Sequence, residues 1–182
     1  PGEAPSMQTL LGSYLAANMA RGDNDSDSAA AFYRKALALD PTSEVLLEQT
    51  FQAEAAEANW DRAVPLARKL VAKDPNHQMA HIVLGLDDFK KGNYAKAEKQ
   101  FAAANDGLIG ELTSALSRAW AALAAGDGDR SLKLLKKPNQ AEGARFYLDY
   151  HAGLIADVAG KPKEAGAAFE RSSRPASYPH LR

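Results

Sequence analysis

The 182-residue chain contains no cysteine, which excludes disulfides, thiolate zinc sites and a cysteine nucleophile. β-Branched residues are also scarce, because Val, Ile and Thr together number 12 against 37 Ala and 21 Leu. Ala and Leu favour helices, whereas β-branched residues favour strands. The composition therefore predicts an all-α protein and argues against both an all-β fold and a Val/Ile-rich parallel sheet.

An excess of charge of one sign is missing as well. Lys and Arg number 22 and Asp and Glu number 23, for a net charge of −1. Proteins that bind nucleic acid usually carry a basic face, so we expect no nucleic-acid partner. No stretch approaches the roughly 18 consecutive apolar residues of a membrane helix, and we expect no direct membrane insertion.

A period of 34 residues runs through the chain. The turn glycines Gly92, Gly126 and Gly160 are spaced by 34, and Asp40-Pro41 recurs as Asp74-Pro75. Two further columns keep the same spacing: Ala29, Ala63, Ala97, Ser131 and Ala165, and Tyr33, Ala67, Phe101, Leu135 and Phe169. Such a fixed period indicates stacked copies of one supersecondary unit.

Each repeat holds two amphipathic stretches of helical spacing, separated by a short turn. Glycine closes a helix at low cost in the left-handed conformation, and proline after Asp ends the second stretch. The pattern predicts about ten helices in five repeats, near residues 7–41, 42–75, 76–107, 108–138 and 139–174. Residues 1–6 are expected to be a flexible segment, and residues 175–182 a tail or the start of further repeats.

These features resemble the tetratricopeptide repeat (TPR) over about residues 7–173. The segments that carry the resemblance are Tyr33-Arg34-Lys35-Ala36-Leu37-Ala38-Leu39-Asp40-Pro41, His81 to Gly85, and Gly92-Asn93-Tyr94 followed by Phe101. The resemblance implies a right-handed α-solenoid. Ala-rich TPR chains of this kind look bacterial, so we expect a bacterial protein of the envelope, the periplasm or the cytoplasm.

Some positions depart from the repeat. The first turn, from Gly22 to Asp27, contains two extra residues when counted from Gly22, and Arg118 stands where the family places a core Leu. We expect Pro138 to cut the second helix of the fourth repeat short, near Lys137. The chain begins at Pro1 rather than Met, and its last repeat lacks Asp-Pro, so we expect a fragment of a longer chain.

Two patterns could suggest a metal, and neither is complete. His77 and His81 are four residues apart but have no third ligand nearby. Asp23, Asp25 and Asp27 imitate the start of a calcium loop, but the required Gly and bidentate Glu are absent. We expect two ordinary polar residues in the first case. In the second case we expect a solvated turn in which Asp27 or Ser26 caps the next helix.

The sequence contains no nucleophile–base set, phosphate loop or paired catalytic carboxylates, so we expect no enzyme, no cofactor and no catalytic residues. In TPR arrays the first helix of each repeat lines a concave groove. By resemblance, Val45 and Met79 face this groove. The predicted partner-binding residues are Glu48, Gln52, Ile82, Leu86, Phe89, Leu116, Trp120, Leu123, Tyr147, Tyr150 and Leu154.

This groove is polar near its N-terminal end and apolar-aromatic towards its C-terminal end. Some TPR domains clamp a C-terminal carboxylate with Lys and Asn, but apolar residues such as Leu86 and Trp120 occupy those positions here. The leading hypothesis is therefore a protein-interaction scaffold that binds a peptide or an amphipathic helix. The alternative is a self-association module whose apolar face is covered by further repeats or by a second copy.

Overall fold

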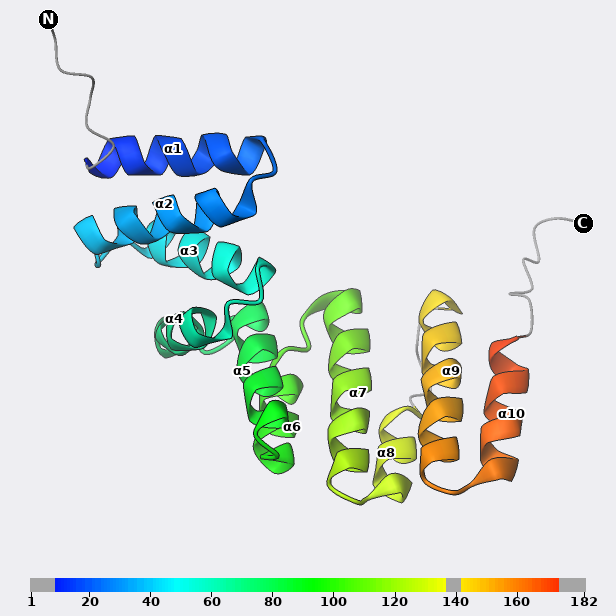
Figure 1. Cartoon of the computed structure of the whole chain (residues 1–182). Coiled ribbons are helices and arrows are strands. Elements are labelled where there is room, and N and C mark those ends of the chain that lie inside the picture. Colours follow the sequence, from blue (N-terminus) through cyan, green and yellow to red (C-terminus); the bar gives the residue numbers. More distant parts are fainter. Residues whose placement is uncertain (1–8, 137–141, 174–182) are drawn as a thin grey trace, which may run out of the picture. The chain divides into compact units, whose positions relative to one another are not determined.

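The structure is a computed structural model that describes residues 9–136 and 142–173, and Figure 1 shows its course. These residues form helices and no strand, which confirms the predicted all-α class. The helices are α1 (Leu10–Gly22), α2 (Ser26–Leu39), α3 (Glu44–Ala56), α4 (Trp60–Lys73), α5 (Gln78–Lys90), α6 (Tyr94–Ala103), α7 (Gly107–Ala124), α8 (Gly128–Leu134), α9 (Glu142–Val158) and α10 (Pro162–Ser172). Segments 1–6 and 175–182 of the predicted domain plan lie outside the described residues.

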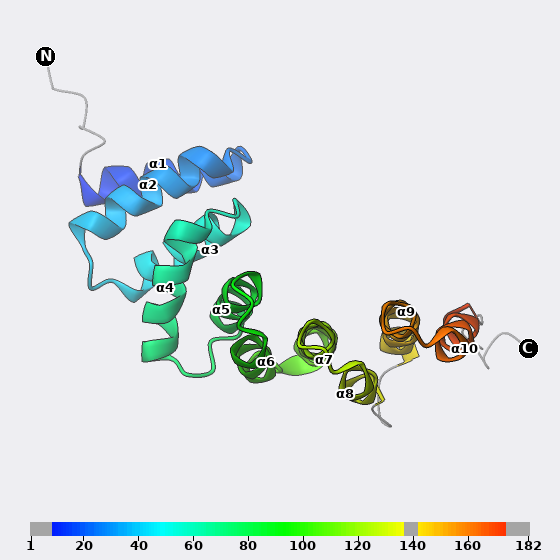
Figure 2. The same cartoon turned by 60° about the horizontal axis from the view of Figure 1, so that its bottom comes forward.

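The chain divides into two compact units, an N-terminal unit (Pro1–Val83) and a C-terminal unit (Leu84–Arg182). In the N-terminal unit α1 packs on α2, α2 on α3, and α3 on α4. In the C-terminal unit α6 packs on α7, α7 on α8, both α7 and α8 on α9, and α9 on α10. Figure 2 views the helices of the C-terminal unit nearly along their axes. No helix in the described part is long and apolar enough to cross a membrane.

The turns between paired helices keep the 34-residue period throughout. Each turn contains one residue with positive φ: Asn24 (58°), Ala58 (53°), Gly92 (77°), Gly126 (86°) and Gly160 (71°). The prediction of two extra residues in the first turn is therefore wrong. The residue that closes the helix in the left-handed conformation there is Asn24, which tolerates that conformation, while Gly22 is the last residue of α1.

The helices of a pair cross where one large side chain meets one small residue. A Cβ on Gly85 would lie 2.4 Å from a ring atom of Phe101, and a Cβ on Gly153 would lie 2.5 Å from the ring of Phe169. At the equivalent positions the other repeats combine Ala17 with Tyr33, Phe51 with Ala67, and Ala119 with Leu135, all of them buried. In the second repeat the large residue belongs to the first helix of the pair instead of the second. The volume that the two side chains fill at the crossing stays similar.

The column of small residues lies at the same crossings. Ala29, Ala63, Ala97, Ser131 and Ala165 are all buried, so this column consists of packing points. The single polar member, Ser131, satisfies its hydroxyl by donating to the Ala119 carbonyl oxygen over 2.6 Å. Its hydrogen bond removes the cost of burying an oxygen in this position.

Side-chain caps begin several helices. Asp25 is the N-cap of α2, and its Oδ1 accepts the N–H of Ser28 over 3.1 Å. The expectation that Asp27 or Ser26 caps this helix is therefore wrong, because both residues already lie in its first turn. Asp25 is placed correctly because it follows the left-handed Asn24 directly.

Helix α8 is the shortest, with 7 residues, against 14 in α2 and α4. This agrees with the predicted short second helix of the fourth repeat, although Pro138 itself lies outside the described residues. Arg118, the expected misfit of this repeat, is half-buried, and its guanidinium lies 3.5 Å from the Glu98 carboxylate. The charge is thus paired rather than left in the core.

The close approach at Gly85 leads to a stability prediction. Gly85→Ala places a methyl group against the Phe101 ring and should destabilise the fold by about 1–3 kcal/mol through overpacking. Gly166→Ala on α10 is the matched control, because a Cβ there meets nothing within 4 Å. It should be neutral or stabilising by about 0.5–1 kcal/mol, since Ala is the better helix former. Urea denaturation of both variants measures the difference, and equal midpoints would contradict the assigned crossing.

Candidate functional site

The C-terminal unit contains a hollow of about 620 Å³ at the C-terminal ends of three successive first helices. We call it the apolar hollow. It is lined by Phe89 of α5, by Trp120, Leu123 and Ala124 of α7, by Gly126, Gly128 and Asp129 of the turn and α8, and by Val158, Ala159 and Lys161 around the end of α9. Large apolar side chains from α5, α7 and α9 thus face one space.

Small residues in the turns allow this space to form. Gly126 has a φ of 86°, which lets α7 end sharply. A Cβ on Gly128 would lie only 2.9 Å from the Ala159 Cβ, so the start of α8 touches the end of α9 without a side chain between them. The lining of the apolar hollow therefore combines small residues of the turns with larger side chains from α5, α7 and α9.

Trp120 joins two of the helices that form the hollow. Its indole Nε1 donates a hydrogen bond to Nδ1 of His151 over 3.0 Å, and the two rings meet edge to face. Trp120 is half-buried and also packs against the core around Ala119 and Ile155. Trp120 is thus part of the wall and part of the packing between α7 and α9, so replacing it would disturb both.

The acceptor role of His151 fixes its protonation state. Nδ1 can accept the indole proton only in the neutral ring, with the ring proton on Nε2. Burial lowers the pKa of the His151 imidazole below its usual value, which favours the same neutral form.

The charges at the rim of the hollow neutralise each other. Lys161 Nζ lies 2.5 Å from Asp129 Oδ1 and 3.6 Å from the Glu164 carboxylate. The hydrogen bond to Lys161 lowers the pKa of Asp129, and the same bond raises the pKa of Lys161. Both groups therefore stay charged and paired at neutral pH, and the rim offers no unpaired lysine to hold a carboxylate.

The predicted groove residues of the C-terminal unit fall into two groups. Phe89, Trp120 and Leu123 meet at the apolar hollow. The others do not line it: Leu86, Tyr147 and Tyr150 are exposed, while Leu116 and Leu154 are half-buried.

Tyr150 belongs to an aromatic cluster on α9. Its ring stacks on Phe146 at a centroid separation of 6.2 Å and meets Phe169 of α10 edge to face at 6.0 Å. Tyr147 meets Phe146 edge to face at a centroid separation of 5.3 Å. The two tyrosines are exposed, and Tyr150 contacts α10 through Phe169.

The predicted residues of the N-terminal unit are mostly engaged with one another. Glu48 lies 2.7 Å from Nε2 of His77 through one oxygen and accepts from the Gln52 amide over 2.6 Å through the other. Gln52, together with Arg21 and Tyr33, lines a small hollow of about 220 Å³ between α1, α2 and α3. Ile82 is half-buried on α5.

The histidine pair does not converge on one point. His77 bonds to Glu48, whereas Nε2 of His81 lies 2.8 Å from the Pro75 carbonyl oxygen. Among the residues that the structure describes, no group of three or more His, Asp or Glu side chains could hold a metal ion.

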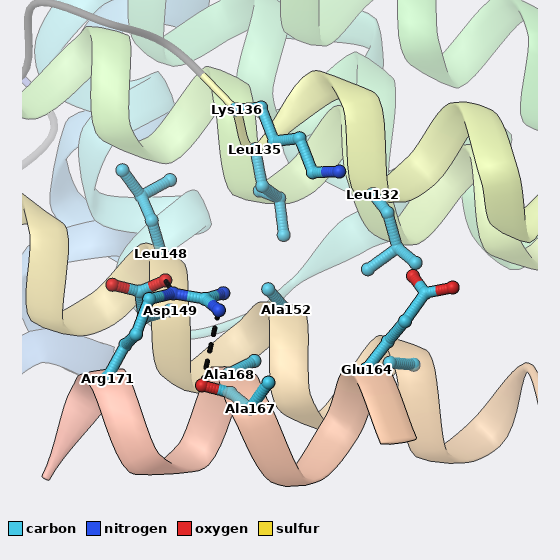
Figure 3. Close-up of a pocket in the computed structure, with 11 residues that line it drawn as sticks. Leu132, Leu135, Lys136, Leu148, Asp149, Ala152, Glu164, Ala167, Ala168 and Arg171 are labelled. Carbon is cyan, nitrogen blue, oxygen red and sulfur yellow. Dashed lines mark hydrogen bonds and ion pairs between the residues drawn. The ribbon is translucent and has the colours of Figure 1, made fainter. Parts of the chain in front are cut away.

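A second hollow of the C-terminal unit, of about 180 Å³, lies between α8, α9 and α10 (Figure 3). Leu132, Leu135 and Leu148 point into it. Arg171 borders it, donating from Nε to Asp149 Oδ1 over 2.8 Å and from its guanidinium to the Ala167 carbonyl oxygen. This hollow would hold little more than one side chain.

Sequence analysis missed several residues of the site. Val158 and Lys161 line the hollow, and His151 orients Trp120. Val158 lies 34 residues after Ala124, which is the neighbour of the predicted groove residue Leu123. Including this neighbouring position in the predicted groove would have identified Val158. Lys161 and His151 had no such signal, because their roles depend on contacts across helices.

No protein-family model matches the chain, and no curated protein sequence does. Solved structures do match. A crystal structure of MamA protein aligns at 18% identity and a TM-score of 0.71, covering 91% of this chain and 90% of that one. MamA 41-end from Desulfovibrio magneticus RS-1 aligns at 15% identity and a TM-score of 0.71, covering 90% of this chain and 92% of that one.

A structure of putative kinesin light chain nearly identical TPR-like repeats from Podospora anserina aligns at 17% identity. Its TM-score is 0.67, and the alignment covers 94% of this chain and 95% of that chain. At these identities the likeness establishes the fold, which is that of TPR-like repeat solenoids, as the sequence predicted. Bacterial origin, compartment and the lack of enzyme activity stay predictions.

The Trp120–His151 hydrogen bond leads to a prediction about pH. Because the folded state lowers the pKa of His151, the stabilisation is present above the unfolded pKa of about 6.5 and is lost as the pH falls through the lower folded pKa. The melting temperature of the parent should therefore drop between pH 7.5 and pH 5 more than that of His151→Asn. The variant keeps an acceptor but does not titrate. Parallel melting curves for the two proteins would contradict this assignment.

Proposed function

We propose that the chain is a non-enzymatic protein-interaction scaffold whose apolar hollow holds an apolar segment of a partner protein, either an amphipathic helix or an extended peptide. The observation that carries the proposal is the gathering of Phe89, Trp120, Leu123 and Val158 from three first helices at one hollow. Stacked helical repeats commonly offer such surfaces to protein partners.

The chemistry of the hollow favours an apolar ligand. Val158 is 69% exposed at its edge, so a large aliphatic surface faces solvent when no partner is bound. The charged lining residues, Asp129 and Lys161, bind each other and leave no unpaired charge for an acidic or basic ligand. Burial of apolar surface would then supply most of the binding free energy.

The size and rigidity of the hollow also fit a peptide. A volume of about 620 Å³ is large enough for several side chains. The walls belong to helices already fixed by core packing, and Trp120 is held in place by His151. A preformed site of this kind avoids much of the ordering cost of binding.

Val158→Asp tests the proposal with little risk to the fold, because the side chain is largely exposed. Peptides selected from a displayed random library on the parent chain serve as probes. We expect them to be rich in Leu, Phe and Trp, and their affinity by calorimetry should fall about tenfold or more for Val158→Asp, a loss of about 1.4 kcal/mol. Their affinity should change little with salt, since the contact is apolar.

Ile109→Asp is the matched control. Ile109 lies on α7 in the same unit and is 81% exposed, but it does not line the hollow. This variant should bind the selected peptides as the parent does. Charged peptides that bind the parent and Val158→Asp equally well would show that the hollow is not the binding site.

A further inference from the structure

Helix α1 presents an apolar face that nothing in the described chain covers. Leu15 is 52% exposed and Met19 is 70% exposed, and the two side chains lie one helical turn apart. Large apolar side chains at this exposure are unusual in a repeat array, where a neighbouring helix normally covers such positions or polar residues occupy them.

The repeat register identifies the equivalent residues in the other first helices. None of them is exposed. The equivalents of Leu15 are Gln49, Val83, Ser117 and His151, and those of Met19 are Ala53, Asp87, Ala121 and Ile155.

The second helix of the preceding repeat covers these positions inside each unit. Ala121 of α7 packs against Ala97 and Phe101 of α6. Ala53 of α3 packs against the cluster around Tyr33 of α2, and Ile155 of α9 shares a cluster with Leu132 of α8. The face of α1 therefore has the position and the chemistry of a surface that receives a second helix.

Helix α10 has residues that are more exposed than their equivalents in the other second helices. Gly166 is exposed, whereas Ala30, Val64 and Leu132 at the equivalent positions are buried and Glu98 is half-buried. Phe169 is likewise half-buried, although the equivalent residues of the other repeats are all buried: Tyr33, Ala67, Phe101 and Leu135. Among the described residues α10 is thus the second helix that no later first helix covers.

We propose that the chain assembles head to tail, with α10 of one copy packed on the Leu15–Met19 face of α1 of a second copy. The contact would continue the stacking of second helices on first helices that each unit already shows. The open space at Gly166 would accept the long side chains of Leu15 and Met19, which repeats the pairing of one large and one small partner found inside the repeats. This surface is separate from the apolar hollow.

The proposed contact joins two different faces, so each added copy leaves one α1 face and one α10 face free. Such heterologous contacts produce chains or closed rings rather than two-fold dimers. A single pair of helices buries less surface than a standard stable interface, so the association is expected to be weak and concentration-dependent.

Disulfide trapping detects a weak contact, and the absence of native cysteine makes it specific. Met19→Cys and Gly166→Cys, made in separate molecules and mixed under mild oxidation, should give the heterodimer in several-fold excess over either homodimer. Leu11→Cys replaces Met19→Cys as the control. Leu11 is 66% exposed on the same helix. Three of its four equivalents, Val45, Met79 and Tyr147, are exposed too, and Thr113 is half-buried, so this position is less covered than that of Met19.

Light scattering supplies an independent measurement. Met19→Glu and Gly166→Glu should each prevent growth of the parent assembly, and an equimolar mixture of the two should form a complex that stops at a dimer, because each variant keeps one intact face. Val158→Asp should assemble like the parent. The test therefore stays valid even if the apolar hollow does not bind a peptide.

Three outcomes would overturn the proposal. One is trapping of Met19→Cys with Gly166→Cys at no more than the Leu11→Cys level, which would mean that another molecule or another segment of a longer chain covers these faces. The second is a dominant Met19→Cys homodimer, which would indicate two-fold pairing of α1. The third is a parent assembly that both Glu variants leave unchanged.

Discussion

The structure depends on one steric constraint, the pairing of a large with a small residue where the two helices of a repeat cross. Phe101 needs Gly85 and Phe169 needs Gly153, because a methyl group at either glycine would overlap the ring. This contact fixes the rotation of each first helix about its axis. Phe89, one helical turn after Gly85, packs against the same Phe101 cluster. Together with Trp120 and Val158 it lines the apolar hollow.

The sequence predicts most of this fold because the constraint recurs every 34 residues. The columns of small and large residues and the paired helices follow from the period, whereas the short α8 is predicted from Pro138. The prediction for the first turn is wrong because it counts from Gly22, whereas the physical requirement is a left-handed backbone, which Asn24 supplies. Asp25 caps α2 because it directly follows the left-handed Asn24.

The candidate site is less predictable. Phe89, Trp120 and Leu123 follow from the repeat register alone. The hydrogen bond from Trp120 to His151, the ion pair of Lys161 with Asp129, and the contact of Tyr150 with Phe169 depend on side-chain rotamers and on neighbouring helices. A single sequence gives no signal for these contacts, and they decide which aromatic side chains line the hollow.

A double-mutant cycle on Gly85 and Phe101 measures the central constraint most directly. Gly85→Phe should overpack the crossing and Phe101→Ala should leave a cavity, each costing about 2 kcal/mol or more. The double variant recreates the Phe51 and Ala67 arrangement of the second repeat, so its free energy of unfolding should exceed the additive value by about 2 kcal/mol. Additive losses would show that the two residues do not share one packing site and would contradict the account.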